Sequence, residues 1–274
     1  MKKLQWYFPD SIEEALTLLK GGKTVPHSGG TSLANRGLSS VSALVDTAGL
    51  PLKYLRIDSG NLEIGANETY ASVADGLRNI LPGNLLIESL GHAASTPLRN
   101  RITLGGSASL FPLWSDLLGP MAVLNGEIRA EGKNGGSYDV FAWIRDHSLQ
   151  RETLITSLFF PVAADWLSCY YRETRVGFDY PSFTVSVLGR INGKTIDTVR
   201  IALSGGLDRV HRLKALEEAL TGRDVFHLSS VDVLSMASVP FGRKPSGSPE
   251  YLSAVAAVQV KRCLETVLFQ EERR

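Results

Sequence analysis

The chain has 274 residues, with 29 lysines and arginines against 28 aspartates and glutamates, so its formal charge is +1. This balance gives no electrostatic argument for nucleic-acid binding. Hydrophobic residues make up 43% of the chain, which is normal for a globular protein long enough to form two domains. No run reaches the length of a membrane span and the N-terminus is too short and mixed for a signal peptide, so we expect a cytoplasmic protein.

In the first half, Ser11 and Glu14 fit a capping box, with Asp10 as an alternative cap. The apolar stripe that follows predicts a helix ending at Gly21-Gly22. Ser59-Gly60-Asn61 predicts the turn of a hairpin, because it lies between two alternating runs. Further helices are expected from Thr69, over 85–93 and after Asp116. Strands are expected at 23–25, 43–46, 55–58, 62–65, 102–104, 127–131 and 153–160.

The pattern changes near Ala163-Ala164, where we place a domain boundary. Strands are predicted at 167–172, 183–188 and 195–203, the last two joined at Asn192-Gly193. A helix over 213–220 follows, and a final helix begins at Ser248-Pro249, with Gln259 at the edge of its buried face. Residues 208–212 read as an exposed turn and helix start. Consecutive strands backed by helices indicate an α+β domain.

Two glycine loops stand out. In Ser95–Ser107, the pair Gly105-Gly106 allows close approach of main-chain N–H groups to a ligand, while Asp116 offers an acceptor for polyol hydroxyls. Locally, this stretch fits an ordinary glycine turn equally well. A second loop at 26–33 combines Gly29 and Gly30 with hydroxyl side chains, which is typical of an anion-binding nest. Neither loop matches a Rossmann or P-loop motif, so the pair suggests a diphosphate held from two sides.

Both loops resemble flavin loops of the FAD-binding middle subunit of molybdenum hydroxylases, the family of carbon monoxide dehydrogenase and xanthine dehydrogenase. Ser28-Gly-Gly-Thr-Ser-Leu33 is similar to the family's Ala-Gly-Gly-Thr-Asp-Leu. The run from Arg99 to Ser107, followed by Ser115-Asp116, is similar to its second signature. Further similarity at 178–187, 202–206 and in the C-terminal helix extends the resemblance to nearly the whole chain.

The resemblance implies an α+β fold, with a two-subdomain FAD-binding domain of the vanillyl-alcohol-oxidase-like (PCMH) type at 1–163, subdivided near 53, and a smaller α+β domain with an antiparallel sheet at 164–274. It implies no catalytic side chain and no metal ligand. The residues it implies for cofactor binding are Ser28, Gly29, Gly30, Thr31, Ser32, Leu33, Thr103, Leu104, Gly105, Gly106, Ser107, Asp116, Phe160 and Tyr171. Phe160 would contribute its backbone, and Tyr171 would lie close to the isoalloxazine.

The function implied is electron transfer. Non-covalent FAD would take electrons from iron–sulfur clusters and pass them to NAD+, a quinone or oxygen. The partners implied are a large subunit with the molybdenum cofactor and a small 2Fe-2S subunit, in a dimer of heterotrimers. The isolated cysteines, Cys169 and Cys263, fit this division, because they form no C-x-x-C motif and argue against a cluster, structural zinc or disulfide framework in this chain. A buried thiol is expected at each.

Two other functions stay open. A free-standing FAD oxidoreductase usually has a larger substrate domain than residues 164–274 provide. A flavin-free assembly or scaffold paralogue is suggested by the bulky run Leu110–Trp114, where the family has small residues. His27 either helps to neutralise the ligand or attaches flavin covalently. Arg99 and Arg101 fit a phosphate, a partner subunit or solvent equally.

Overall fold

The structure is a computed structural model that describes residues 4–37, 39, 41–162 and 165–269. The chain divides into two compact units. The N-terminal unit comprises Met1–Gly76, Ser95–Phe111 and Asn125–Val162, and the C-terminal unit comprises Leu77–Ala94, Pro112–Leu124 and Ala163–Arg274. The predicted boundary at Ala163-Ala164 lies outside the described residues, so the division into 1–163 and 164–274 stays a prediction.

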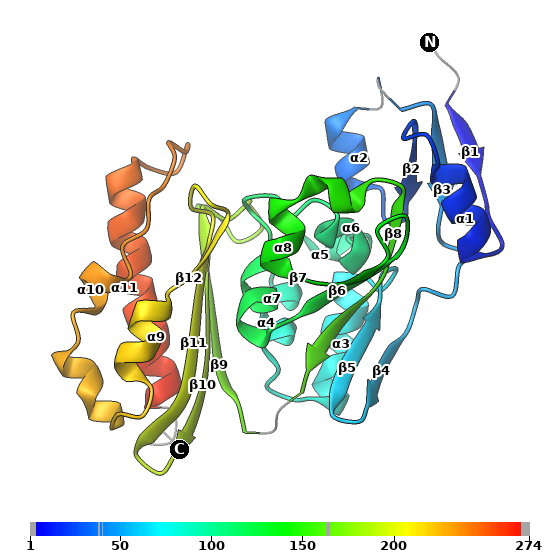
Figure 1. The fold of residues 1–274 in the computed structure, drawn as a ribbon. Coiled ribbons are helices and arrows are strands. Elements are labelled where there is room, and N and C mark those ends of the chain that lie inside the picture. The colour runs from blue at the N-terminus through cyan, green and yellow to red at the C-terminus, as the bar shows by residue number, and fades with distance from the viewer. Residues whose placement is uncertain (1–3, 38, 40, 163–164, 270–274) are drawn as a thin grey trace. The chain divides into compact units, whose positions relative to one another are not determined.

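The N-terminal unit contains two sheets (Figure 1). The first is parallel, with strand order β1-β3-β2, and consists of β1 (Gln5–Tyr7), β2 (Thr24–His27) and β3 (Ala43–Asp46). The second is antiparallel, with order β4-β5-β8-β6-β7, and consists of β4 (Leu55–Asp58), β5 (Asn61–Gly65), β6 (Glu127–Gly132), β7 (Gly136–Asp139) and β8 (Thr153–Pro161). The parallel sheet carries the first glycine loop at the end of β2.

The helices of the first half are short. They are α1 (Ile12–Leu19), α2 (Thr31–Arg36), α3 (Tyr70–Ile80), α4 (Leu85–Gly91), α5 (Thr96–Arg99), α6 (Leu104–Ala108), α7 (Leu118–Leu124), α8 (Val140–Arg145) and the 3-10 turn η1 (His147–Gln150). The Ser11 hydroxyl caps α1 by accepting from Glu14 N at 3.1 Å, as predicted. Ala15 and Leu19 of α1 pack on Val45 and Leu154, which joins this helix to both sheets.

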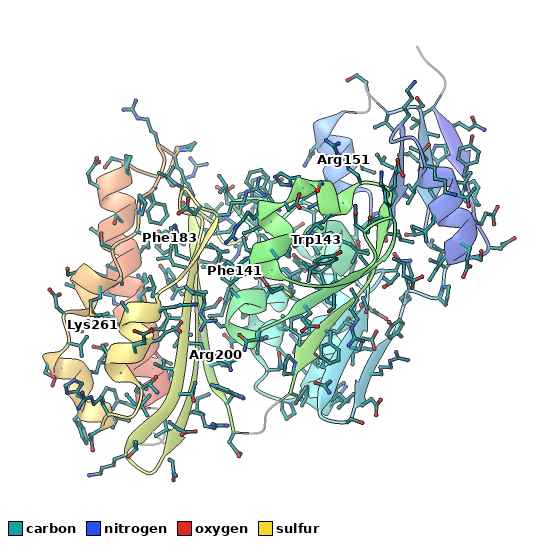
Figure 2. The ribbon with its side chains drawn as sticks, viewed as in Figure 1. Phe141, Trp143, Arg151, Phe183, Arg200 and Lys261 are labelled. Atoms are coloured by element: carbon teal, nitrogen blue, oxygen red, sulfur yellow. The ribbon has the colours of Figure 1, made fainter. Side chains whose placement is uncertain are left out.

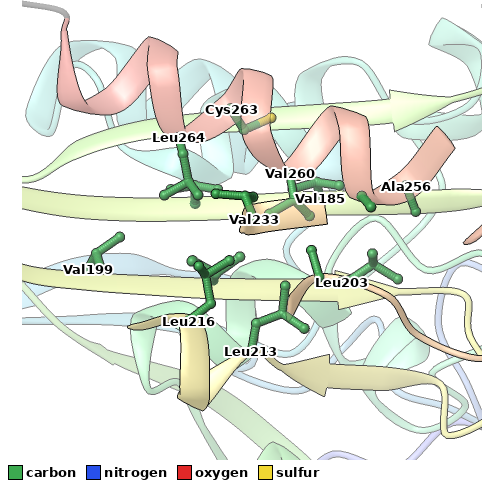
Figure 3. Close-up of a cluster of buried hydrophobic side chains, with 14 of the residues drawn as sticks. Val185, Val199, Leu203, Leu213, Leu216, Val233, Ala256, Val260, Cys263 and Leu264 are labelled. Atoms are coloured by element: carbon green, nitrogen blue, oxygen red, sulfur yellow. The ribbon is translucent and has the colours of Figure 1, made fainter. Parts of the chain in front are cut away.

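The C-terminal unit is built on an antiparallel sheet of order β12-β11-β10-β9. Its strands are β9 (Leu167–Glu173), β10 (Phe183–Asn192), β11 (Thr195–Ser204) and β12 (Val210–Arg212). One face is covered by α9 (Lys214–Leu220), η2 (Val225–Ser230), α10 (Val233–Met236) and α11 (Pro249–Leu268), as Figure 1 shows. The core between them is mainly aliphatic, with Val185, Leu203, Leu216 and Val260 packed together (Figure 3).

Helix α7 covers the other face of the same sheet, and all seven of its residues are buried. Gly119 permits this close packing, because a Cβ there would lie 2.6 Å from Ser186 Oγ. Arg200 of β11, labelled in Figure 2, donates to Val123 O at 3.0 Å, and Arg212 donates to Ala122 O at 2.8 Å. These two guanidinium groups satisfy carbonyls at the C-terminal end of α7.

The α+β class and the antiparallel second sheet are confirmed, but three local predictions are wrong. Residues 102–104 form no strand, because Leu104 opens helix α6 and only Thr103 makes an isolated bridge, to Thr69. Residues 210–212 form β12 rather than an exposed turn, since they pair with β11. Gln259 is 9% exposed and counts among the buried residues of α11, instead of lying at the edge of the buried face. These differences arise from packing between segments distant in sequence.

Candidate functional site

The first glycine loop connects β2 to α2. Gly30 caps α2 in the left-handed region, with φ +74°, which a glycine adopts without strain. Among the residues that the structure describes, the main-chain N–H groups from Gly29 to Leu33 have no hydrogen-bond acceptor. Consecutive free N–H groups at the start of a helix attract an anion. The Thr31 and Ser32 hydroxyls lie beside them and are half-buried.

Arg101 holds this loop from the side. Its guanidinium donates from Nε and Nη2 to Gly29 O, at 3.1 and 2.8 Å. The main chain of Arg101 also lies close to the loop, since a Cβ at Gly29 would be 1.7 Å from Arg101 O. Position 29 therefore requires glycine, because a side chain there would clash with the main chain of Arg101. The Arg101 side chain holds the loop by donating to the carbonyl of Gly29.

His27 lies directly beneath the loop. Its Nδ1 is 3.2 Å from Asp46 Oδ2, and the edge of its ring meets Trp6 at a centroid distance of 4.8 Å. The other ring nitrogen, Nε2, is 2.7 Å from the position of a Cβ at Gly30. Asp46 thus fixes the imidazole so that Nε2 faces the loop. Both predicted roles for His27 stay predictions.

The second glycine motif forms the first turn of α6, and its amides are mostly used within the protein. Thr103 Oγ1 caps the helix by accepting from Gly106 N at 3.2 Å. Leu104 N donates to Glu68 O and Gly105 N donates to Ala66 O, both at 2.9 Å. Ser107 N donates to Thr103 O at 3.0 Å. The part of this motif open to a ligand is the exposed Gly106 and the half-buried Ser107.

Helix α6 is also fixed at its far end. The Trp143 indole of α8, labelled in Figure 2, donates from Nε1 to Ala108 O at 3.0 Å. Trp143 is almost fully buried, with 1% exposure. The second motif is therefore rigid on both sides.

Asn67 joins the two motifs. Its Oδ1 accepts from Ser28 Oγ at 2.9 Å and from Thr47 Oγ1 at 3.0 Å, and its Nδ2 donates to Thr47 O at 2.6 Å. The neighbours of Asn67 on either side accept the two α6 amides described above. The segment 66–68 therefore contacts the first loop through a side chain and the second through its main chain. No local sequence signal marks Asn67 for this role, because its partners are distant along the chain.

Asp116 belongs to a buried charged network in the C-terminal unit. Its Oδ1 accepts from Tyr170 OH at 2.8 Å and from Arg172 Nε at 2.6 Å. Burial raises the pKa of Asp116, against the charge of Arg172. Arg172 also donates to the carbonyls of Gly177 and Asp179, at 3.1 and 2.9 Å, which shapes the loop after β9.

The structure does not bring Tyr171 together with Asp116. Tyr171 alternates with Tyr170 and Arg172 along β9 and therefore lies on the opposite face of the sheet, packed against the core beneath α11. Its hydroxyl donates to Glu173 Oε2 at 2.5 Å. The alternation of side chains along a strand could have indicated that Tyr170 and Arg172, not Tyr171, share the face of β9 that meets Asp116.

Phe160 lies within the five-stranded sheet, where it pairs with Leu62 and is 1% exposed. It is four residues along β8 from Thr156, whose carbonyl accepts from Ala66 N beside the second motif. Four residues of strand span about 13 Å. Along the strand, Phe160 therefore lies about 13 Å from the point where β8 bonds to Ala66.

The bulky run after the second motif serves two purposes. Phe111 is buried in the core with 1% exposure. Trp114 is 46% exposed, and its ring lies 5.0 Å from that of Tyr180. The run therefore supplies one core residue and one exposed aromatic pair.

The described residues provide neither a membrane-spanning helix nor a metal-binding cluster. No helix in that part of the chain is long and apolar enough to cross a membrane. No group of three or more His, Cys, Asp or Glu side chains there is placed to hold a metal ion.

Residues 2–163 match the family model described as the FAD binding domain in molybdopterin dehydrogenase. The chain belongs to this family, and it is an FAD-binding component of an oxidoreductase. The resemblance inferred from the two glycine motifs is thereby confirmed.

Two curated proteins to which the chain is similar are dehydrogenase subunits. It is 24% identical over 240 residues to the glyceraldehyde dehydrogenase medium chain of Sulfolobus acidocaldarius, covering 84% of this chain and 85% of that one. It is 27% identical to the caffeine dehydrogenase subunit beta of a Pseudomonas species, over 82% of this chain and 80% of that one. Carbon monoxide dehydrogenase from Hydrogenophaga pseudoflava has the same fold, with a TM-score of 0.87, 24% identity and 97% coverage of both chains. The predicted fold class is confirmed.

The geometry fits FAD at the first loop. Five adjacent N–H groups and two hydroxyls match the acceptor oxygens of a diphosphate, and no carboxylate among the described contacts of residues 29–33 opposes an anion there.

Proposed function

We propose that this chain binds FAD non-covalently and serves as the electron-transfer subunit of a molybdenum-containing hydroxylase or dehydrogenase. It would receive electrons from iron–sulfur clusters on a partner and pass them to NAD+, a quinone or oxygen. The bound flavin supplies the electron-carrying chemistry, and the protein supplies binding and orientation. The observation that supports this proposal most is the row of free N–H groups from Gly29 to Leu33 in a member of the FAD-binding family.

In this proposal the loop Ser28–Leu33 encloses the diphosphate, and Arg101 and Asn67 hold the loop in place. In the second segment, Thr103–Ser107, the exposed Gly106 and the hydroxyl of Ser107 face the ligand, while Thr103, Leu104 and Gly105 form the rigid support. The two loops would therefore bind the ligand differently. The first loop offers free main-chain N–H groups, whereas the amides of the second segment already have acceptors within the protein.

Asp116 is proposed to accept a ribityl or ribose hydroxyl through Oδ2. That oxygen is the less engaged one, since its contact with Arg172 Nη2 is 3.5 Å long. The proposed contributions of the Phe160 backbone and of Tyr171 rest on the family resemblance alone. Tyr171 lies on the face of β9 opposite Asp116. Tyr170, on the same face as Asp116, is the tyrosine that bonds to it.

The proposed partners are a large subunit with the molybdenum cofactor and a small 2Fe-2S subunit, assembled as a dimer of heterotrimers in the cytoplasm. The names of the relatives, a medium chain and a subunit beta of dehydrogenases, support this assembly. The division into an FAD-binding domain at 1–163 and a C-terminal domain at 164–274 is part of the same proposal.

The first experiment is the visible absorption spectrum of the purified full chain, supplemented with FAD and desalted, before and after denaturation. We expect an oxidised-flavin spectrum that moves to the supernatant when the protein is precipitated. Flavin that stays with the precipitate would indicate covalent attachment, with His27 the first residue to test. A colourless protein would refute the flavoprotein function and favour the scaffold paralogue.

A pair of variants tests the N–H groups directly. Ser32→Pro removes one free N–H in the first turn of α2, where the missing donor breaks no intrahelical bond. Ser32→Ala removes only the hydroxyl. We expect FAD affinity to fall about tenfold for the proline variant, the loss of one charge-assisted hydrogen bond, and less for alanine. Equal affinity of both variants and the wild type, with unchanged circular dichroism, would overturn the assignment of this loop.

The partners and the acceptor need a separate experiment. A tagged chain isolated from its native host should carry molybdenum and iron in addition to flavin. The complex, reduced by its substrate, should then be reoxidised by one of NAD+, a quinone analogue or oxygen. A chain that is isolated with flavin but with neither metal would favour a free-standing oxidoreductase.

A further inference from the structure

The two cysteines of this chain meet in the fold. Cys169 lies on β9 and Cys263 on α11, which packs against that strand in the C-terminal unit. Both side chains pack in the cluster between β9 and α11, and both are free thiols. Figure 3 shows Cys263 at the edge of the apolar cluster beneath α11. Sequence reasoning treated the two as isolated, because 93 residues separate them.

The environments of the two sulfurs differ. Cys169 is half-buried, whereas Cys263 is 3% exposed. The neighbouring Cys263 thiol lowers the pKa of Cys169, although burial opposes this shift. The neighbouring Cys169 thiol and burial both raise the pKa of Cys263. A more acidic, accessible thiol beside a buried second thiol is the arrangement of redox-responsive pairs, in which the first sulfur is oxidised and the second resolves it.

We propose that Cys169 and Cys263 are a peroxide-sensitive pair that forms a reversible disulfide between β9 and α11. The Cys169 thiolate attacks hydrogen peroxide, which forms an S–O bond, breaks the O–O bond and releases water after protonation. The Cys263 sulfur then attacks the Cys169 sulfur, so that the S–S bond forms, the S–O bond breaks and a second water leaves with the Cys263 proton. In total, two thiols lose two electrons and two protons to one peroxide.

The cross-link would act on a strand that matters for the rest of the unit. Tyr170, the next residue after Cys169, donates to Asp116, and Arg172 lies two residues further along. A disulfide would fasten β9 to α11 on the face opposite these contacts. Oxidation should therefore raise the thermal midpoint of this unit, because the closed loop restricts the unfolded chain.

The test is differential alkylation of the purified full chain. The protein is treated with hydrogen peroxide, denatured, alkylated and digested, and the cysteine peptides are identified by mass spectrometry. We expect a peptide pair joined through Cys169 and Cys263, no alkylated thiol, and recovery of both thiols after dithiothreitol. Two alkylatable thiols, or a disulfide only between two copies of the chain, would overturn the proposal.

Single variants separate the two roles. In Cys263→Ser, peroxide should convert Cys169 to a sulfenic acid that a dimedone probe labels. In Cys169→Ser, Cys263 should stay reduced at the same peroxide dose. Labelling of Cys263 rather than Cys169 would contradict the assignment. The wild-type cross-link remains decisive if the buried substitution at 263 impairs folding.

Discussion

The Ser28 hydroxyl donates to the side-chain oxygen of Asn67 at 2.9 Å, and this hydrogen bond ties the first glycine loop to the segment that supports the second. Asn67 orders a loop whose own main chain makes few internal bonds. A loop with free N–H groups needs such external support, since nothing inside it fixes its shape.

Replacing Asn67 with alanine should therefore weaken FAD binding, although in this proposal the side chain supports the loop and does not contact the ligand itself. The change removes three hydrogen bonds, each worth about 1 kcal/mol, and part of that loss should appear as about tenfold weaker binding. Titration of the flavin-free chain, followed by flavin fluorescence, measures the Kd. Asn61→Ala is the matched control, because that amide bonds only within the β4–β5 turn. Equal effects of both variants would refute the linking role.

Gly30→Ala should be costlier than an ordinary glycine substitution in a turn. Alanine at φ +74° is strained, and its Cβ would also lie 2.7 Å from His27 Nε2. Gly60→Ala isolates the first effect, since Gly60 has φ +75° and no atom within 4 Å of the added Cβ. We expect Gly60→Ala to destabilise by about 1 kcal/mol and Gly30→Ala by more, with loss of FAD. The urea unfolding midpoints of both variants provide the comparison.

Glu63 should give the N-terminal unit an acid-sensitive contribution to stability. Its carboxylate accepts hydrogen bonds from three side chains, Tyr54, Arg56 and Ser157. Burial opposes ionisation, but these bonds outweigh it and lower the pKa of Glu63 to about 2. Because the folded-state pKa is depressed from 4.5, the contribution is complete above pH 4.5 and is lost as the pH falls towards 2.

Glu63→Gln tests this expectation. The variant should be less stable than wild type by about 2 kcal/mol at neutral pH, and the difference should shrink between pH 4.5 and 2. The exposed Glu131→Gln, on β6 of the same sheet, is the charge control. A stability difference that is constant across this pH range would show that the hydrogen-bonded carboxylate is not responsible.

The Asp116–Arg172 pair should behave as a buried ion pair. Its two side chains are 8% and 10% exposed. Asp116→Asn leaves Arg172 buried without a counter-charge, so we expect a loss of about 3 kcal/mol in the free energy of unfolding. The exposed pair Arg190–Asp197, with 43% and 47% exposure, is the comparison, and Asp197→Asn should cost less than about 1 kcal/mol.

A double variant sharpens that prediction. Asp116→Asn combined with Arg172→Met removes both charges, and its loss should be smaller than the sum of the two single losses. Chemical unfolding followed by tryptophan fluorescence measures all of these values. Additive losses would mean that the two groups do not interact in the folded protein.

Much of the fold follows from local sequence signals. Ser59-Gly60 set the β4–β5 hairpin, and Ser248-Pro249 set the start of α11, because turns and caps depend on residues that are close in sequence. β1 was not predicted, since it is three residues long and forms by pairing with β3. Leu104, predicted in a strand, opens a helix because Glu68 and Ala66 accept its first amides.

The candidate site divides in the same way. The first glycine loop could be predicted, because its glycines and hydroxyls are adjacent in sequence. Asn67, Arg101 and Arg172 could not be assigned their roles, since each acts on a partner that is distant along the chain. The pairing of Cys169 with Cys263 was missed for the same reason.

The buried helix α7 has a consequence for how this protein is made. It belongs to the C-terminal unit, yet roughly 80 residues separate its end from the end of β11, the strand whose Arg200 caps it. At about 5–20 residues per second, a ribosome needs about 4–16 s to supply that strand. During this interval a helix with seven residues destined for the interior lacks the sheet that covers it. Chaperone demand should therefore peak midway through translation, and a fragment that ends at residue 162 should aggregate.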